Sequence, residues 1–97
     1  MTPQFIVRPE AERDLRAAYV WYEGQVIGLG DEFLMKIDVA FAVIRRHPLA
    51  FPIIYEDVRR AVVRRFPYSV FYVAADERTV VLSVMHTRQD PSEWPRR

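Results

Sequence analysis

The chain has 97 residues, which suits one domain, and its 14 basic and 13 acidic side chains leave a formal net charge of +1. A composition that is 51% hydrophobic and 28% charged excludes disorder as the main state. The absence of cysteine excludes disulfide bonds, thiolate metal sites and cysteine nucleophiles. No apolar run exceeds six residues and acidic residues begin at Glu10, so we expect neither a membrane span nor a signal segment. These features predict a single cytoplasmic domain over residues 1–97.

The start of the chain predicts a strand followed by a helix. Residues 4–8 are β-prone and stop at Pro9, which suits a short strand. Proline at a first helical position, followed by acidic residues, favours the start of a helix. Apolar residues then recur at helical spacing as far as about Gln25: Ala11, Leu15, Ala18, Tyr19 and Tyr22.

A second helix follows a glycine-bearing connection. All three glycines, Gly24, Gly28 and Gly30, fall within seven residues, which indicates a tight turn between helices. Asp31 is the predicted N-cap, and His47 before Pro48 ends the helix because a residue preceding proline avoids helical dihedrals. The short connection predicts an antiparallel helix hairpin.

The rest of the chain predicts a sheet. Residues 49–57 form a proline-punctuated connector, and Asp76-Glu77 has turn character. Three β-prone runs cover 58–66, 68–75 and 79–86. The predicted order is β-α-α-β-β-β. We expect an α+β fold in which the antiparallel helix hairpin packs on one face of a small, mainly antiparallel sheet.

Charge is distributed unevenly along the chain. Residues 1–44 hold four basic and seven acidic side chains, a net of −3, whereas residues 45–97 hold ten arginines and six acids, a net of +4. Arginine binds phosphate and carboxylate in a bidentate way. The arginine-rich half is compatible both with an anionic partner and with an ordinary solvated face.

Four arginines lie on one predicted strand: Arg59, Arg60, Arg64 and Arg65. Strand residues alternate between faces, so Arg60 and Arg64 are expected on one side and the other two on the opposite side. The functional interpretation is an anion site for phosphate, RNA or acidic side chains, and we favour it for at least two of the four. The structural alternative is a solvated edge with local ion pairs.

Of the two histidines, only His86 is a candidate for acid–base catalysis. His86 ends the last predicted strand and could act as a general acid or base, or serve a structural role through its ring nitrogens. His47 is better explained as a cation at a helix C-terminus. No metal-ligand spacing is present, so we predict no metal and no cofactor.

The aromatic residues are interpreted first as core. Tyr19 and Tyr22 lie on the apolar stripe, whereas Trp21 falls off it and could touch a partner. Phe66, Tyr68 and Tyr72 are expected to pack on the sheet. Trp94 lies near two terminal arginines, where it could make a stacking or partner contact or fold back on the core.

The order of elements and several motifs together resemble the RelE/ParE superfamily of toxins over roughly residues 4–94. The motifs are Trp21-Tyr22-Glu23, Arg59-Arg60, Arg65-Phe66-Pro67-Tyr68 with Tyr72, and His86-x-Arg88-x-Asp90-Pro91. The resemblance implies the toxin of a type II toxin–antitoxin pair that arrests growth. It implies an antitoxin that folds as it wraps the toxin, with operator DNA bound only through that antitoxin.

Departures from the ribonuclease branch favour ParE over RelE. That branch typically has lysines on the second strand, an arginine after the tyrosine of the third-strand motif, and a C-terminal tyrosine. Here Ser69 follows Tyr68, the strand bears arginines, and Trp94 has no hydroxyl to donate a proton. The ParE branch inhibits DNA gyrase by binding, so no catalytic set is required. Gyrase is the expected target.

The resemblance suggests residues that bind target or antitoxin: Arg59, Arg60, Arg64, Arg65, Arg88 and Trp94. The alternative is a ribosome-dependent messenger RNA endoribonuclease with phosphate-binding and acid–base residues Arg64, Arg65, His86 and Arg88. A third interpretation is an inactive toxin that acts only as an antitoxin-binding co-repressor.

Overall fold

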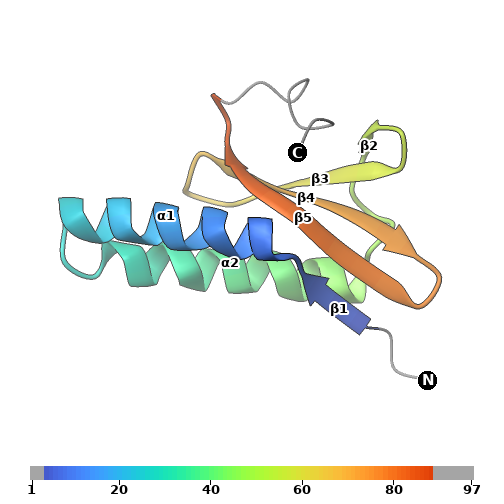
Figure 1. Ribbon diagram of the computed structural model, residues 1–97, viewed down its shortest axis with the longest axis horizontal. Coiled ribbons are helices and arrows are strands. Elements are labelled where there is room, and N and C mark those ends of the chain that lie inside the picture. The colour runs from blue at the N-terminus through green and yellow to red at the C-terminus, as the bar shows by residue number, and fades with distance from the viewer. Residues whose placement is uncertain (1–3, 89–97) are drawn as a thin grey trace.

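The computed structural model describes residues 4–88 as a sheet covered on one face by two helices (Figure 1). In chain order the elements are β1 (Gln4–Val7), α1 (Pro9–Gln25), α2 (Leu29–Arg46), β2 (Ile53–Tyr55), β3 (Val58–Val62), β4 (Tyr68–Ala75) and β5 (Arg78–His86). The predicted α+β class and helix hairpin are confirmed, with one strand more than expected. Within residues 4–88, no helix is both long and apolar enough to cross a membrane.

The five strands form one sheet in the order β1-β5-β4-β3-β2. Strand β1 runs parallel to β5, and the other pairs are antiparallel, as the sequence predicted for most of the sheet. β1 and β2 are therefore the two edges. The helices run side by side beneath the sheet, α1 against β5 and α2 toward β3 (Figure 1).

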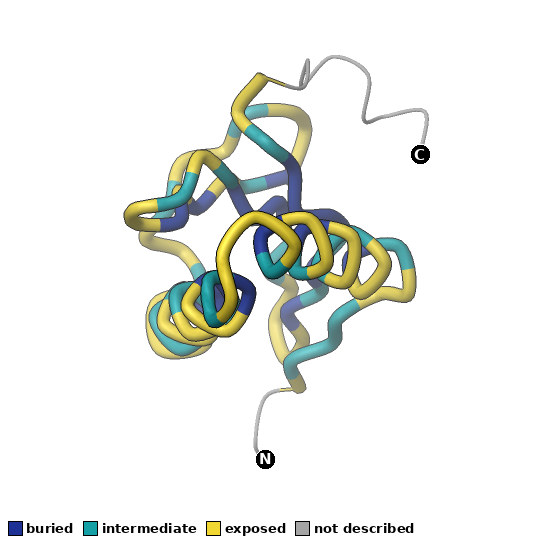
Figure 2. Tube along the Cα trace, turned by 90° about the vertical axis from the view of Figure 1, so that its left-hand side faces the viewer, coloured by how far each residue is buried: buried dark blue, intermediate teal, exposed yellow. Residues whose placement is uncertain are grey.

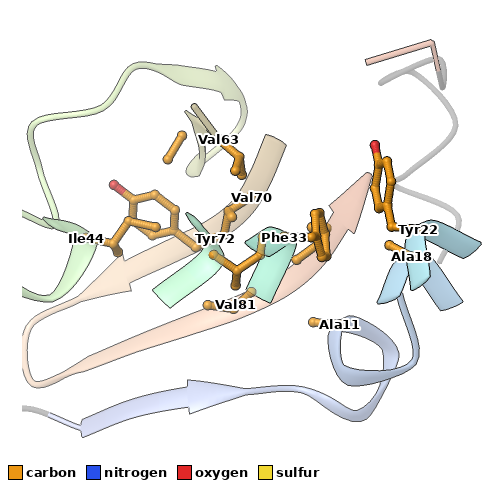
Figure 3. Packing of buried hydrophobic residues seen from close by; sticks show 12 residues of the cluster. Ala11, Ala18, Tyr22, Phe33, Ile44, Val63, Val70, Tyr72 and Val81 are labelled. Carbon is orange, nitrogen blue, oxygen red and sulfur yellow. The ribbon is translucent and has the colours of Figure 1, made fainter. Parts of the chain in front are cut away.

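The core lies between the helix hairpin and the sheet. Figure 2 looks along the helices and shows their outward turns exposed and their buried residues turned inward. Phe33 and Ile44 on α2 are fully buried, as are Tyr72 and Val81 on the sheet (Figure 3). Removing such apolar surface from water stabilises the fold by about 25 cal/mol per Å².

The start of α2 differs from the prediction. The helix begins at Leu29, and its N-cap is Gly28 with φ of 91°, so the prediction of Asp31 as N-cap was wrong. The reason is a carboxylate from the other helix. Glu23 accepts hydrogen bonds from the N–H groups of Gly28 and Gly30, both at 2.9 Å. This side chain supplies the negative charge and the acceptors that a helix N-terminus needs.

The predicted strand 58–66 ends early, and the connector 49–57 contains a strand that the sequence analysis missed. β3 stops at Val62, and Arg65 lies in the following turn with φ of 70°, a left-handed conformation. β2 covers only three residues between Pro52 and Glu56. A strand this short, next to a proline, carries little periodic signal.

An irregularity in the β4–β5 ladder is tied to α1. The register places Phe71 opposite Ser83 but Tyr72 opposite Val81, so β5 holds one extra residue. Asp14 accepts a hydrogen bond from the N–H of Val84 at 2.9 Å, just beyond this bulge. The contact anchors α1 on β5 and fixes the strand that carries His86.

Candidate binding surfaces

The two arginines on β3 have different environments. Arg59 pairs with Tyr72 and faces the helices, and its Nη1 donates to the carbonyl oxygens of Leu49 at 3.2 Å and Phe51 at 2.6 Å. It therefore holds the connector that precedes β2. Arg60 pairs with Phe71 on the opposite face and is exposed. The predicted alternation of these two residues is confirmed, and Arg60 is the one accessible to a partner.

Arg64 and Arg65 lie in the turn between β3 and β4, so their predicted placement on the strand was wrong. The left-handed backbone at Arg65 ends the extended conformation there. Both side chains are exposed. They reach solvent from the end of β3 and from neither sheet face.

These two arginines border a groove between α2 and β3, which we call the α2/β3 groove. Its volume is about 460 Å³. Its lining residues are Lys36, Val39, Ala40, Val43, Phe51, Ala61, Val62, Arg64 and Arg65. The sequence analysis did not single out the helix side of this groove. The available signal was the spacing of Lys36, Val39 and Val43, which places them along one side of a helix.

A second hollow, the His86 pocket, lies where α1 ends above the start of β4. It is lined by Trp21, Tyr22, Pro67, Tyr68, His86 and Arg88, with a volume of about 470 Å³. The rings of Tyr68 and His86 meet edge to face with centroids 5.3 Å apart. The N–H of Arg88 donates to Nδ1 of His86 at 3.0 Å, which makes Nδ1 an acceptor and leaves Nε2 to carry the ring proton.

The four residues of the ribonuclease alternative line two different hollows. His86 and Arg88 line one pocket, whereas Arg64 and Arg65 line the α2/β3 groove. Trp21 is 60% exposed at the rim of the His86 pocket, as its position off the apolar stripe predicted. Trp94 and the Asp90-Pro91 pair lie outside the described residues.

The sheet face turned away from the helices is apolar in its middle. Phe71 and Met85 are buried there, and Val73 and Leu82 pack with them. Ser69, where the ribonuclease pattern has arginine, is only 5% exposed and pairs with Met85. Within the part of the chain that the structure describes, the middle of this face is therefore apolar, and Arg60 is exposed beside Phe71.

Three core tyrosines keep their protons at neutral pH. Burial raises the pKa of Tyr22, Tyr68 and Tyr72 above that of a free tyrosine. The nearby Asp14 carboxylate raises the pKa of Tyr68 further, while the Arg59 guanidinium partly offsets the effect of burial on the pKa of Tyr72. Tyr68 beside His86 is thus a neutral phenol, whose hydroxyl can donate a hydrogen bond.

Because the pKa values of these tyrosines are raised, we expect the protein to lose stability at alkaline pH. A raised pKa means that the folded state holds protons that the unfolded chain releases near pH 10. The contribution of these three tyrosines to the free energy of unfolding is complete below that pH. It is lost as the pH rises through their folded-state pKa values. Melting temperatures by circular dichroism between about pH 8 and 11 check this, and Tyr68→Phe should reduce the slope. Tyr55→Phe, at an exposed site, is the control, and an unchanged melting temperature above pH 10 would contradict the expectation.

Comparisons with known proteins agree with this architecture. A toxin–antitoxin structure, the chromosomal ParDE system of Pseudomonas aeruginosa, contains a chain that is 16% identical. The match has a TM-score of 0.78 and covers 88% of this chain and 96% of that one. A chain of the RelBE2 toxin–antitoxin complex from Mycobacterium tuberculosis is 23% identical with a TM-score of 0.55, over 89% and 99% of the two chains. Both likenesses concern the fold.

A sequence search of curated proteins finds no match. The family model described as the ParE toxin of the type II toxin–antitoxin system parDE matches residues 5–91. This match includes both helices, all the strands from Phe5 onward and the two hollows described above. The chain belongs to the family of ParE toxins of type II toxin–antitoxin systems.

Proposed function

We propose that this toxin arrests growth by binding DNA gyrase and inhibiting it, without catalysing a reaction of its own. The observation that carries the proposal is that His86 and Arg88 line the His86 pocket, whereas Arg64 and Arg65 line the α2/β3 groove. Cleavage of RNA needs an acid–base pair and cationic groups around a single phosphate. The four residues of the ribonuclease alternative do not line one pocket, which favours inhibition by binding.

The sheet supports the same interpretation. Ser69 stands where a ribonuclease would have a guanidinium, and its neighbours are the apolar side chains of Phe71 and Met85. Inhibition by binding makes no such demand, because a protein interface is built from apolar contacts surrounded by polar groups. Arg60 and Trp21 are exposed and suit such an interface.

The proposal includes neutralisation by a cognate antitoxin. Both similar structures contain a toxin together with its antitoxin. We infer that an acidic antitoxin segment covers part of the arginine-rich half of this chain, and that operator DNA is bound through the antitoxin. A gyrase target also implies that the toxin acts in the cytoplasm.

Purified toxin should inhibit supercoiling by gyrase and should leave messenger RNA on ribosomes intact. His86→Ala should change the inhibition by less than about twofold, since loss of a general acid or base costs about 10²–10⁴-fold only where proton transfer is catalysed. Supercoiling on gels and primer extension on ribosome-bound messenger RNA are the two measurements.

Messenger RNA cleavage that disappears in His86→Ala would instead favour the ribonuclease alternative. In cells, induction without antitoxin should reduce thymidine incorporation before amino-acid incorporation. If neither falls while the antitoxin still binds, the chain is an inactive toxin that acts as a co-repressor.

A further inference from the structure

The His86 pocket combines the side chains that protein interfaces use most for tight binding. Its lining includes one tryptophan, two tyrosines and one arginine. These three residue types are the most enriched among binding hot spots, and the aromatic ones join a large apolar area to a polar group that can form a hydrogen bond. The pocket therefore has the composition of a protein-binding site.

The two tyrosines of the pocket belong to the aromatic core. Tyr22 and Tyr68 both contact the fully buried ring of Phe33, with centroids 5.4 Å and 5.1 Å away. Tyr22 also meets the ring of Phe66 edge to face at 5.0 Å. Close-packed core side chains keep their positions, so this hollow exists before a partner binds. A preformed hollow suits a folded partner, because neither protein then loses much conformational freedom on binding.

Two lining residues are accessible to such a partner. Trp21 is largely exposed, and its indole N–H has no acceptor within residues 4–88. Arg88 is exposed, and its guanidinium makes no ion pair within the same part of the chain. None of the described lining residues carries a carboxylate. Since a guanidinium pairs with a carboxylate in a bidentate way, the pocket favours a partner with an acidic side chain.

Apolar surface continues from the pocket into the turn between the helices. The N–H of Val26 donates to the carbonyl oxygen of Tyr22 at 3.2 Å, so the turn follows directly on a lining residue. Val26 and Ile27 are 60% and 93% exposed. In Figure 1 this turn lies at one end of the helix hairpin, and β1 lies at the other. Large apolar side chains left in water beside a pocket are typical of an interaction site.

We propose that gyrase binds this end of the molecule, which we call the hairpin-end surface: the His86 pocket together with Val26 and Ile27. An apolar side chain of gyrase enters the pocket beside Trp21, a carboxylate of gyrase pairs with Arg88, and apolar residues of gyrase cover Ile27. The inference rests on the proposed inhibition of gyrase, and it adds the surface of the toxin and the chemistry of the gyrase segment. The hydrogen bond between His86 and Arg88 is exposed to solvent, which agrees with the small effect expected of His86→Ala.

The first test removes the exposed aromatic side chain. Trp21→Ala should raise the toxin concentration that halves supercoiling by gyrase at least about tenfold, as expected for a hot spot. Its affinity for the protein encoded beside the gene, measured by titration calorimetry, should change less than about twofold. Inhibition within about twofold of the unmodified toxin would overturn the proposal, and weaker antitoxin binding in that case would assign the pocket to the antitoxin.

The second test uses two exposed aliphatic residues at opposite ends of α2. Ile27 lies just before this helix, and Leu49, which is 69% exposed, lies just after it. Ile27→Asp should raise the half-inhibitory concentration about tenfold or more, because a charge would be buried against apolar residues of gyrase. Leu49→Asp should leave it unchanged. Equal effects of the two substitutions would contradict the hairpin-end surface.

The third test reverses charge at the two ends of β5. Arg88→Glu keeps the main-chain N–H that bonds to His86, and Arg78→Glu makes the same change at the start of the strand. Only Arg88→Glu should weaken inhibition, by about tenfold at low salt and by less at high salt. Melting temperatures from circular dichroism verify that each variant is folded.

The outcomes separate this inference from the proposed function. If the unmodified toxin inhibits gyrase, and the substitutions at Trp21, Ile27 and Arg88 leave the inhibition unchanged, only the hairpin-end surface is overturned. If the unmodified toxin does not inhibit gyrase, the proposed function is overturned and the inference with it.

Discussion

Phe33→Ala should lower the free energy of unfolding by about 3–5 kcal/mol, the usual cost of deleting a buried aromatic side chain. Phe33 is fully buried on α2. Its ring centroid lies 5.4 Å from that of Tyr22, 5.3 Å from Phe66 and 5.1 Å from Tyr68. The side chain therefore joins both helices to the segment that enters β4, and its removal leaves a cavity that none of these rings can fill. Urea denaturation followed by circular dichroism measures the loss.

Trp21→Ala is the matched control. Trp21 is also aromatic and also contacts Tyr22, at 5.1 Å between ring centroids, but it is 60% exposed. Its removal should cost less than about 1 kcal/mol, because most of its surface stays in water when the chain folds. Equal losses in the two variants would mean that burial does not decide the stability of this aromatic cluster.

The helices could be predicted from the sequence because the residues that define them are close together along the chain. A repeat of apolar residues at helical spacing sets the buried face of α1, and Pro9 and His47 mark two of the four helix ends. The start of α2 could not be found this way. Its capping carboxylate, Glu23, belongs to α1 and reaches Gly30 only after the chain has reversed. A local search for a cap instead selected Asp31.

The candidate site depended on tertiary contacts and was predicted less completely. Arg59 was expected to bind a partner, yet its guanidinium donates to carbonyls eight and ten residues away within the fold. A left-handed backbone conformation is usually adopted by glycine, and Arg65 gives no sign of it in the sequence. The end of β3 before this residue could therefore not be predicted. His86 and Arg88 do come together, because the turn after β5 brings the N–H of Arg88 to Nδ1 of His86.

Gly30→Ala should destabilise the protein by about 1–3 kcal/mol through overpacking. A Cβ at Gly30 would lie 2.7 Å and 2.8 Å from two ring carbons of Tyr19 and 2.9 Å from Oε1 of Glu23. That oxygen is the acceptor for the Gly30 N–H, so relief of the clash also disturbs the cap of α2. Thermal and urea denaturation of the variant measure the cost.

Gly24→Ala is the control that separates crowding from backbone freedom. Gly24 lies within α1, and a Cβ there would meet nothing within 4 Å. Both substitutions restrict the unfolded chain equally, so that contribution cancels between them. Gly24→Ala should be neutral or stabilise by up to about 1 kcal/mol. If both variants were stabilised alike, Tyr19 and Glu23 would not pack against Gly30 as closely as the structure requires, and the cap of α2 would need another explanation.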